Sequence, residues 1–270
     1  MSKVNNTEMS FLEHLEELRW HIIRSIASVL ILAVTAFVFK RILFDVIILG
    51  PCQPDFFTNR GLCWMAVKLN IPAICINQEP LNLQNINLAG QFSMHILIAC
   101  VTGIILAFPY IFWEFWRFIK PALYPTEVKH SRGAIFSAST LFSVGILFAY
   151  YVICPLSINF LGNYKVSESV DNIINLNSYV STISSIVLAC GIMFELPVFI
   201  YFLSKVGLVS SSFLRKYRRH AIVISLTVAA IITPPDVFSQ ILVCLPLLAL
   251  YEGSIVIAKR IESKKLPVKV

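Results

Sequence analysis

Six apolar runs, separated by polar segments, divide the 270-residue chain. A membrane-spanning helix needs about 20 mostly apolar residues to cross roughly 30 Å of hydrocarbon. The pattern therefore predicts an all-α, polytopic membrane protein with six transmembrane helices. The expected spans are residues 20–39, 93–113, 133–154, 179–203, 221–233 and 237–257.

The first and fifth runs need separate comment. The first is too long for the apolar core of a signal peptide, and no small-residue cleavage site follows it, so we expect it to remain as an anchor. The fifth has 13 residues, Ala221 to Thr233, before Pro234 and Pro235 end it. That is about 20 Å of helix. We expect this helix to cross only where the bilayer is thinned.

Composition and charge support a membrane protein. Apolar residues make up 57% of the chain and charged residues 14%, with a mean hydropathy of +0.76. A soluble domain carries about 25% charged residues, so a soluble enzyme, a disordered chain and a secreted disulfide scaffold are excluded. Of the 22 Lys and Arg residues, 16 lie in the termini and in the loops after the second and fourth runs, Arg24 lies near the start of the first run, and five lie in the other three loops. This asymmetry predicts that both termini are cytoplasmic, and it explains the net charge of +7 without a nucleic-acid partner.

The longest segment between spans, residues 40–92, is predicted to form an ordered cap on the external membrane surface. With no internal repeat, residues 1–270 are assigned to a single domain. Cys52, Cys63 and Cys75 fall on this oxidising side with Cys154 nearby, so one or two disulfides are expected. Cys52–Cys63 is the pairing expected first, because it closes a short loop.

Glu195 lies inside the fourth span, where a carboxyl group costs on the order of 3 kcal/mol to insert. It is therefore a candidate functional residue, although a protonated side chain hydrogen-bonded only for packing remains the alternative. Pro197 removes a backbone donor two residues later, which predicts a kink. Gly191 shares the face of Glu195 and favours close contact with another helix.

Asp236 follows the two prolines at the turn before the sixth span. Its carboxylate is suited to capping that helix, and a direct functional role is the alternative. Thr233 and Gln240 are polar at depths where the span of a partner could hydrogen-bond to them.

No nucleophile, metal or phosphate motif supports an enzyme. A proton- or ion-coupled transporter with Glu195 as the carrier is a second hypothesis. The sequence shows none of the inverted repeats that such transporters often have, which argues against this hypothesis.

Four short motifs occur in order across about nine tenths of the chain. They are HLEELR (His14–Arg19), FIKPALYPTE (Phe118–Glu127), FELP (Phe194–Pro197) and TPPDVFSQ (Thr233–Gln240). Together they resemble the TatC family, the core receptor subunit of the twin-arginine protein translocase. The resemblance implies a concave arrangement of the spans in a bacterial cytoplasmic (inner) membrane. The chain departs from the family pattern at Trp20 and His21, where members commonly carry a further basic residue. Its first external segment is also longer than usual and contains three cysteines.

The resemblance also implies roles for residues in these motifs. The signal-peptide site would contain Glu127, which suits an arginine fork, together with Glu17, Arg19, Phe118 and Leu123. Small single-span partners of the TatA and TatB types would dock at Glu195, Thr233, Gln240 and Asp236. Pro51, Pro121 and Pro197 would be structural. The family implies a receptor for folded substrate proteins bearing consecutive arginines, a homo-oligomer in the receptor complex, and neither enzyme activity nor a cofactor.

Overall fold

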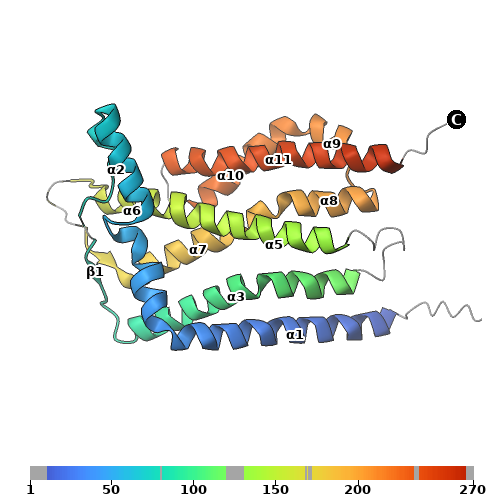
Figure 1. The fold of residues 1–270 in the computed structure, drawn as a ribbon, viewed down its shortest axis with the longest axis horizontal. Helices are drawn as coiled ribbons and strands as arrows, with labels where there is room; N and C mark the ends of the chain where they lie inside the picture. The colour runs from blue at the N-terminus through green and yellow to red at the C-terminus, as the bar shows by residue number, and fades with distance from the viewer. Residues whose placement is uncertain are drawn as a thin grey trace, which may run out of the picture.

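The protein is built almost entirely from helices (Figure 1). The computed structural model describes residues 11–79, 81–119, 131–167, 169, 172–233 and 237–265. The main helices are α1 (Phe11–Val38), α3 (Gly90–Ile119), α5 (Ser131–Phe148), α6 (Cys154–Asn163), α7 (Leu176–Phe194), α8 (Leu196–Val206), α9 (Ser211–Lys216), α10 (Arg218–Ile232) and α11 (Val237–Lys265). A π-helical turn, η5 (Ala149–Ile153), joins α5 to α6 without a break in the rod.

Five helical stretches among the described residues are long and apolar enough to cross a membrane. They match the first four expected spans and the sixth, but each is longer than the apolar run that predicted it, because amphipathic turns extend the helices at their ends. The stretches are His14–Val38, Gly90–Ile119, Ile135–Asn163, Leu176–Val206 and Ser239–Ser263.

The fifth expected span corresponds to α10, which has 15 residues. This is about 22 Å of helix, so the prediction of a short element is confirmed. Arg218 begins it, and Tyr217 separates it from α9. The count of six crossings rests on this short helix and remains a prediction.

The two ends of the bundle differ in the elements and the charged residues that they contain. The described part of α1 begins, α3 and α8 end, and α11 finishes at one end of the molecule (Figure 1). We call this the basic end, because Arg117, Lys205, Arg218 and Lys259 belong to these helix termini or the adjoining turn. The opposite end is the capped end.

The capped end carries the ordered segment predicted between the first two spans. Its elements are η1 (Ile42–Ile48), η2 (Gly50–Cys52), α2 (Phe57–Leu69), η3 (Pro72–Ile74) and the short strand β1 (Leu83–Gln84). A second strand, β2 (Ile174–Asn175), pairs with β1 in parallel. The described residues of this segment therefore form a structured cap.

Helix α7 lies at the centre of the main hydrophobic core. Val180, Ile183 and Ile186 of α7 pack in one buried cluster with Ile98 of α3 and Ile153 of η5. Helices α1 and α3 form an antiparallel hairpin beside this core. They touch closely at Gly103, where an added Cβ would lie 2.8 Å from the backbone of α1. The hairpin brings the first motif next to the end of α3.

Candidate functional site

A buried ionisable cluster joins α1 and α3 at the basic end. Glu114 of α3 is 1% exposed, and its carboxylate accepts a hydrogen bond from the Tyr110 hydroxyl at 2.9 Å. The other carboxylate oxygen contacts Nδ1 of His21, which is itself buried. Nη1 of Arg117 lies 3.8 Å from Oε1 of Glu114. A buried carboxylate needs such partners, because an uncompensated charge there is costly.

The cluster extends along one face of α1. His14, Glu17 and His21 follow the three- and four-residue spacing that places side chains on the same side of a helix. Nε2 of His21 lies 3.9 Å from Glu17 Oε1. The ring of His14 stacks on Phe118 with centroids 4.4 Å apart, and His21 meets the same ring edge-on at 6.2 Å.

Glu17 carries an acceptor that nothing in the described chain satisfies. Its Oε2 atom is buried and has no hydrogen-bond partner among the described residues. The side chain as a whole is 36% exposed. The arrangement offers a carboxylate on the face of α1 whose two histidine rings contact Phe118, and a carboxylate suits a cation.

The structure brings together two of the expected signal-peptide residues, Glu17 and Phe118, through the ring of His14 and the imidazole of His21. Arg19 is exposed on another face of α1. Glu127, Leu123 and Pro121 lie outside the described residues.

Sequence reasoning missed the partnership of His21 with Glu114. Two signals were available: an acid immediately after the second apolar run, three residues before Arg117, and a histidine where a basic residue is common. Neither signal gives the register between α1 and α3. Only that register shows that the two side chains meet.

Glu195 occupies a break between two helices within a candidate span. Helix α7 ends at Phe194, and α8 begins at Leu196 with Pro197 in its first turn. The predicted interruption is confirmed. Both carboxylate oxygens of Glu195 are buried, and no described side chain hydrogen-bonds to them. Such a group is costly in a membrane unless it is protonated or paired.

The face of α7 that precedes Glu195 packs tightly on α5, as the small residue at Gly191 suggested. An added Cβ at Gly191 would lie 2.7 Å from Ile146 and 2.8 Å from Phe142. Opposite, a Cβ on Gly145 would lie 2.8 Å from the Cys190 carbonyl. Two glycines therefore let the helices approach closely.

Thr233 and Gln240 already have partners within the chain. The Thr233 hydroxyl donates to the Ala229 carbonyl at 2.9 Å, within its own helix. The Gln240 amide donates to the Leu226 carbonyl at 3.2 Å and so ties α11 to α10. Among the described residues, no hydrogen bond joins either side chain to Glu195. Asp236 lies outside the described residues.

Comparisons with known proteins identify the family of the chain. The family model described as Sec-independent protein translocase protein (TatC) matches residues 13–246. The chain belongs to the TatC family. It is 42% identical to a TatC protein of Blattabacterium sp. subsp. Periplaneta americana over 97% of this chain and 100% of the relative. A Helicobacter pylori TatC is 36% identical over 92% of this chain and 87% of its own length.

Solved TatC structures share the fold. Two crystal structures of the twin arginine translocase receptor TatC superimpose with TM-scores of 0.68 and 0.71 at 31% and 32% identity. They cover 93% and 91% of this chain, and 100% and 99% of their own chains. The protein is therefore a multi-pass membrane component of a protein translocase rather than an enzyme.

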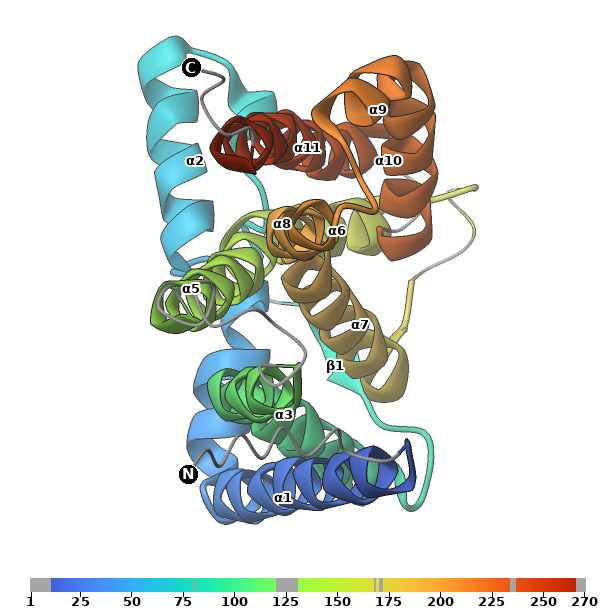
Figure 2. The ribbon, with the colours of Figure 1, turned by 90° about the vertical axis from the view of Figure 1, so that its right-hand side faces the viewer.

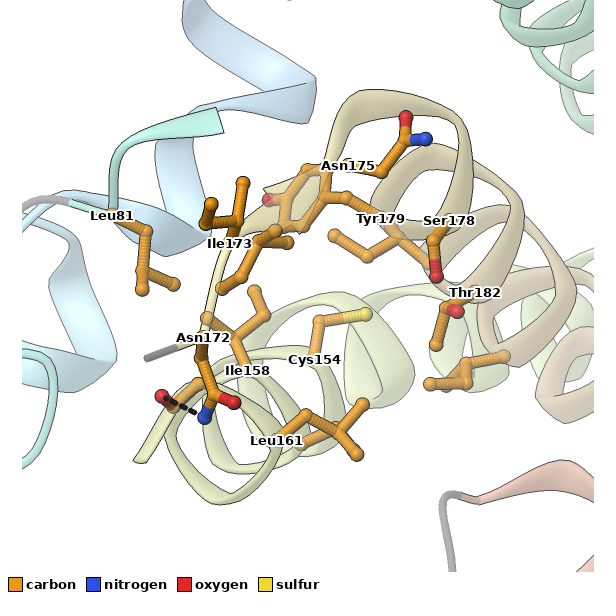
Figure 3. A pocket seen from close by; sticks show the side chains of 15 residues that line it. Leu81, Cys154, Ile158, Leu161, Asn172, Ile173, Asn175, Ser178, Tyr179 and Thr182 are labelled. Atoms are coloured by element: carbon orange, nitrogen blue, oxygen red, sulfur yellow. Dashed lines mark hydrogen bonds between the residues drawn. The ribbon is translucent and has the colours of Figure 1, made fainter. Parts of the chain in front are cut away.

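A partly enclosed cavity lies at the opposite end of this TatC protein from the acidic cluster. It has a volume of about 630 Å³ at the capped end, between α6, β2 and α7 (Figure 3). Its lining mixes apolar side chains such as Ile158 and Leu161 with neutral polar ones such as Asn172 and Thr182. No charged side chain lines it, so it offers an arginine no counter-charge.

The disulfide differs from the expected one. Cys63 pairs with Cys75, 12 residues later, with their Cα atoms 4.1 Å apart, and Cys52 stays a free thiol. The expected Cys52–Cys63 bridge is therefore wrong. Cys52 lies in the buried turn η2, whereas Cys63 on α2 faces the returning chain at η3. Burial raises the pKa of the Cys52 thiol to about 11, which disfavours the reactive thiolate.

Two of the three expected structural prolines lie in the described chain, and both are buried. Pro51 is the middle residue of η2, and its carbonyl accepts a hydrogen bond from the Asn59 amide at 3.2 Å. Pro197 stands in the first turn of α8, where its missing N–H costs little. These positions fit the structural role that the resemblance implies.

Proposed function

We propose that this TatC protein is the receptor that binds twin-arginine signal peptides at the basic end, which faces the cytoplasm. The observation that carries the proposal is the Glu17 carboxylate, whose buried Oε2 atom has no hydrogen-bond partner among the described residues. Glu17 shares a face of α1 with His14 and His21, whose rings contact Phe118. An arginine guanidinium is a planar fork of donors that a carboxylate accepts with two parallel hydrogen bonds. Glu17 therefore offers one of the two acidic groups that consecutive arginines need.

Glu127 is the proposed partner for the other arginine, on the strength of the FIKPALYPTE motif. In the same proposal Phe118 and Leu123 contact the apolar part of the peptide, and Arg19 completes the first motif. The hydrophobic stretch of the peptide then lies along the concave face of the spans. The substrates are folded proteins that carry such signals.

Glu114 and His21 hold the helices that carry the proposed binding face. His21 lies between the carboxylates of Glu17 and Glu114, and its ring also meets Phe118. This contact fixes the side of α1 that carries Glu17 against the end of α3. We infer that the pair positions the binding face and does not itself touch the peptide.

Assembly with small single-span proteins of the TatA and TatB types is the second part of the proposal. Glu195 supports it, because its buried carboxylate lacks a side-chain partner in the described chain. Thr233, Gln240 and Asp236 are assigned to the same docking region, with Gln240 also bracing α10 against α11. We further propose that the protein forms homo-oligomers in the receptor complex of the bacterial inner membrane, with both termini cytoplasmic.

Site-specific crosslinking tests the signal-peptide proposal. A peptide with two arginines and a photoreactive group, and a matched peptide with two lysines, are offered to the protein in lipid nanodiscs. Glu17→Gln should weaken crosslinking of the arginine peptide by about tenfold, the equivalent of one charge-assisted hydrogen bond. Glu16→Gln is the matched control, because Glu16 is exposed on the neighbouring face. Equal crosslinking by both variants would refute the assignment of Glu17.

A further inference from the structure

Helix α2 at the capped end exposes a broad apolar face that the proposed function does not use. Phe57, Trp64 and Val67 are 79%, 64% and 83% exposed. On the opposite side of the same helix, Asn59 and Ala66 are buried in the cap. The helix thus has an inner face that packs and an outer face that the described residues leave largely exposed. Large exposed apolar patches of this kind mark interaction surfaces.

The position of α2 indicates what covers this face. The helix crosses the direction of the spans at their capped end (Figure 1), and it follows the outer edge of the molecule when the bundle is viewed along its axis (Figure 2). The Phe57 ring meets Tyr151 edge-on at 6.1 Å. Tyr151 is 39% exposed and belongs to the candidate span Ile135–Asn163. The apolar face of α2 therefore continues the exposed surface of a helix that is long and apolar enough to span a membrane.

The charges of α2 match a phospholipid surface. Arg60 and Lys68 are exposed, and the helix contains no acidic residue, although Asp55 precedes it. The ammonium group of Lys68 lies 4.9 Å from the centre of the Trp64 ring. Tryptophan next to basic side chains is typical of helices that lie in the plane of a membrane interface.

We propose that α2 is an interfacial anchor whose outer face inserts into the external leaflet of the bilayer. Phe57, Trp64 and Val67 enter the boundary between headgroups and acyl chains, and Arg60 and Lys68 contact lipid phosphates. The Cys63–Cys75 disulfide and the buried Asn59 fasten the inner side of the helix to the cap. The anchor thereby fixes the depth of the capped end in the membrane.

Tryptophan fluorescence in vesicles tests this proposal. The full chain is prepared with Trp64 as its only tryptophan (Trp20→Phe, Trp113→Phe, Trp116→Phe) and reconstituted into phosphatidylcholine vesicles. The vesicles contain lipids brominated either near the headgroup or deep in the acyl chain. A second protein is the matched reporter on the cap. All four of its native tryptophans are replaced by phenylalanine, and its only tryptophan stands at exposed Gln78 (Gln78→Trp). Thermal unfolding of both proteins shows that they retain the fold.

An interfacial α2 predicts that the shallow bromines quench Trp64 more than the deep ones, while iodide in the buffer quenches it weakly. The Gln78→Trp reporter should lose more emission to iodide than Trp64 does. Quenching of Trp64 by iodide without quenching by bromolipids would overturn the proposal, because the face would then lie in water. Protection from both quenchers would also overturn it, because a protein partner such as a second copy of the chain would then cover the helix.

Discussion

The capped end and the basic end are held by different chemistry. At the capped end, the Asn59 amide donates to the carbonyls of Pro51 and Gln53 at 3.2 and 2.8 Å, and it accepts from Asn77 at 3.3 Å. Asn77 also donates to the Pro155 carbonyl at 3.0 Å. At the basic end, the corresponding buried groups are charged or chargeable, and one oxygen of Glu17 has no hydrogen-bond partner among the described residues.

This difference separates a structural network from the proposed binding site. Neutral amides with their hydrogen bonds made stabilise a fold and leave nothing for a ligand to satisfy. An acidic group that lacks a partner costs stability, and a cationic ligand can recover that cost on binding. The two ends should therefore respond to mutation in opposite ways, with stability affected at the capped end and recognition at the basic end.

The largest effect on recognition is expected at Glu127. Glu127→Lys should weaken binding of a twin-arginine peptide by roughly 100-fold or more, because it replaces attraction with repulsion. The midpoint of thermal unfolding should stay unchanged, since the sequence predicts that Glu127 lies in a loop between spans, where a charge contributes little to stability. Glu127→Asp should retain part of the affinity. Wild-type peptide crosslinking by the Glu127→Lys protein would remove Glu127 from the site.

The largest effect on stability is expected at Asn59. Asn59→Ala removes three hydrogen bonds and leaves buried groups without partners, at a cost of about 3 kcal/mol in the free energy of unfolding. Peptide affinity, measured below the unfolding transition, should not change. The control is Asn82→Ala, because the exposed Asn82 side chain makes no hydrogen bond in the described chain. A loss of affinity without a loss of stability would invert the proposed difference between the ends.

The sequence predicted the spans well because hydrocarbon imposes a length and an apolar composition that each helix must meet alone. It also predicted the break at Glu195, since Pro197 acts locally. The cap was harder. Cys63–Cys75 depends on how the chain returns from α2 to η3, which spacing alone does not give. The exposed side of α2 mixes large apolar residues with Arg60 and Lys68, so the sequence gives no simple amphipathic pattern that distinguishes it from the buried side.

The site was predictable only as far as each residue could be judged on its own helix. Motif positions selected Glu17 and Phe118, and the structure places both at the α1–α3 hairpin. The pairing of His21 with Glu114 was not predicted, because it joins residues 93 positions apart through helix packing. For the same reason, the sequence did not predict that Gln240 binds the backbone of α10.

A smaller effect, on both stability and recognition, is expected at Glu114. Glu114→Ala should cost about 2 kcal/mol, because Tyr110 and His21 lose their shared acceptor. Glu114→Gln keeps an oxygen acceptor for Tyr110 and should cost about half as much. If Glu114 positions Glu17 through His21, peptide affinity should fall in both variants in the same order.

Chemical denaturation and peptide titration on the same samples check this order. Glu16→Ala is the control, and we expect it to change stability by less than about 0.5 kcal/mol. Unchanged affinity in a folded Glu114→Ala protein would show that the cluster only holds α1 against α3. That result would limit the recognition surface to residues that touch the peptide.

The smallest effect is expected at Glu195, which belongs to neither end. If its carboxyl group docks a partner helix, Glu195→Gln should keep most export of twin-arginine substrates, because an amide still offers hydrogen bonds at that depth. Glu195→Ala should weaken crosslinking to single-span partners by about fivefold, since a hydrogen bond between membrane helices contributes about 1 kcal/mol. Both variants should bind signal peptide normally. A proton carrier would behave differently, because loss of the titratable group would stop transport equally in the Gln and Ala variants. Equal and complete loss of export with partner crosslinks intact would therefore replace docking with proton transfer as the role of Glu195.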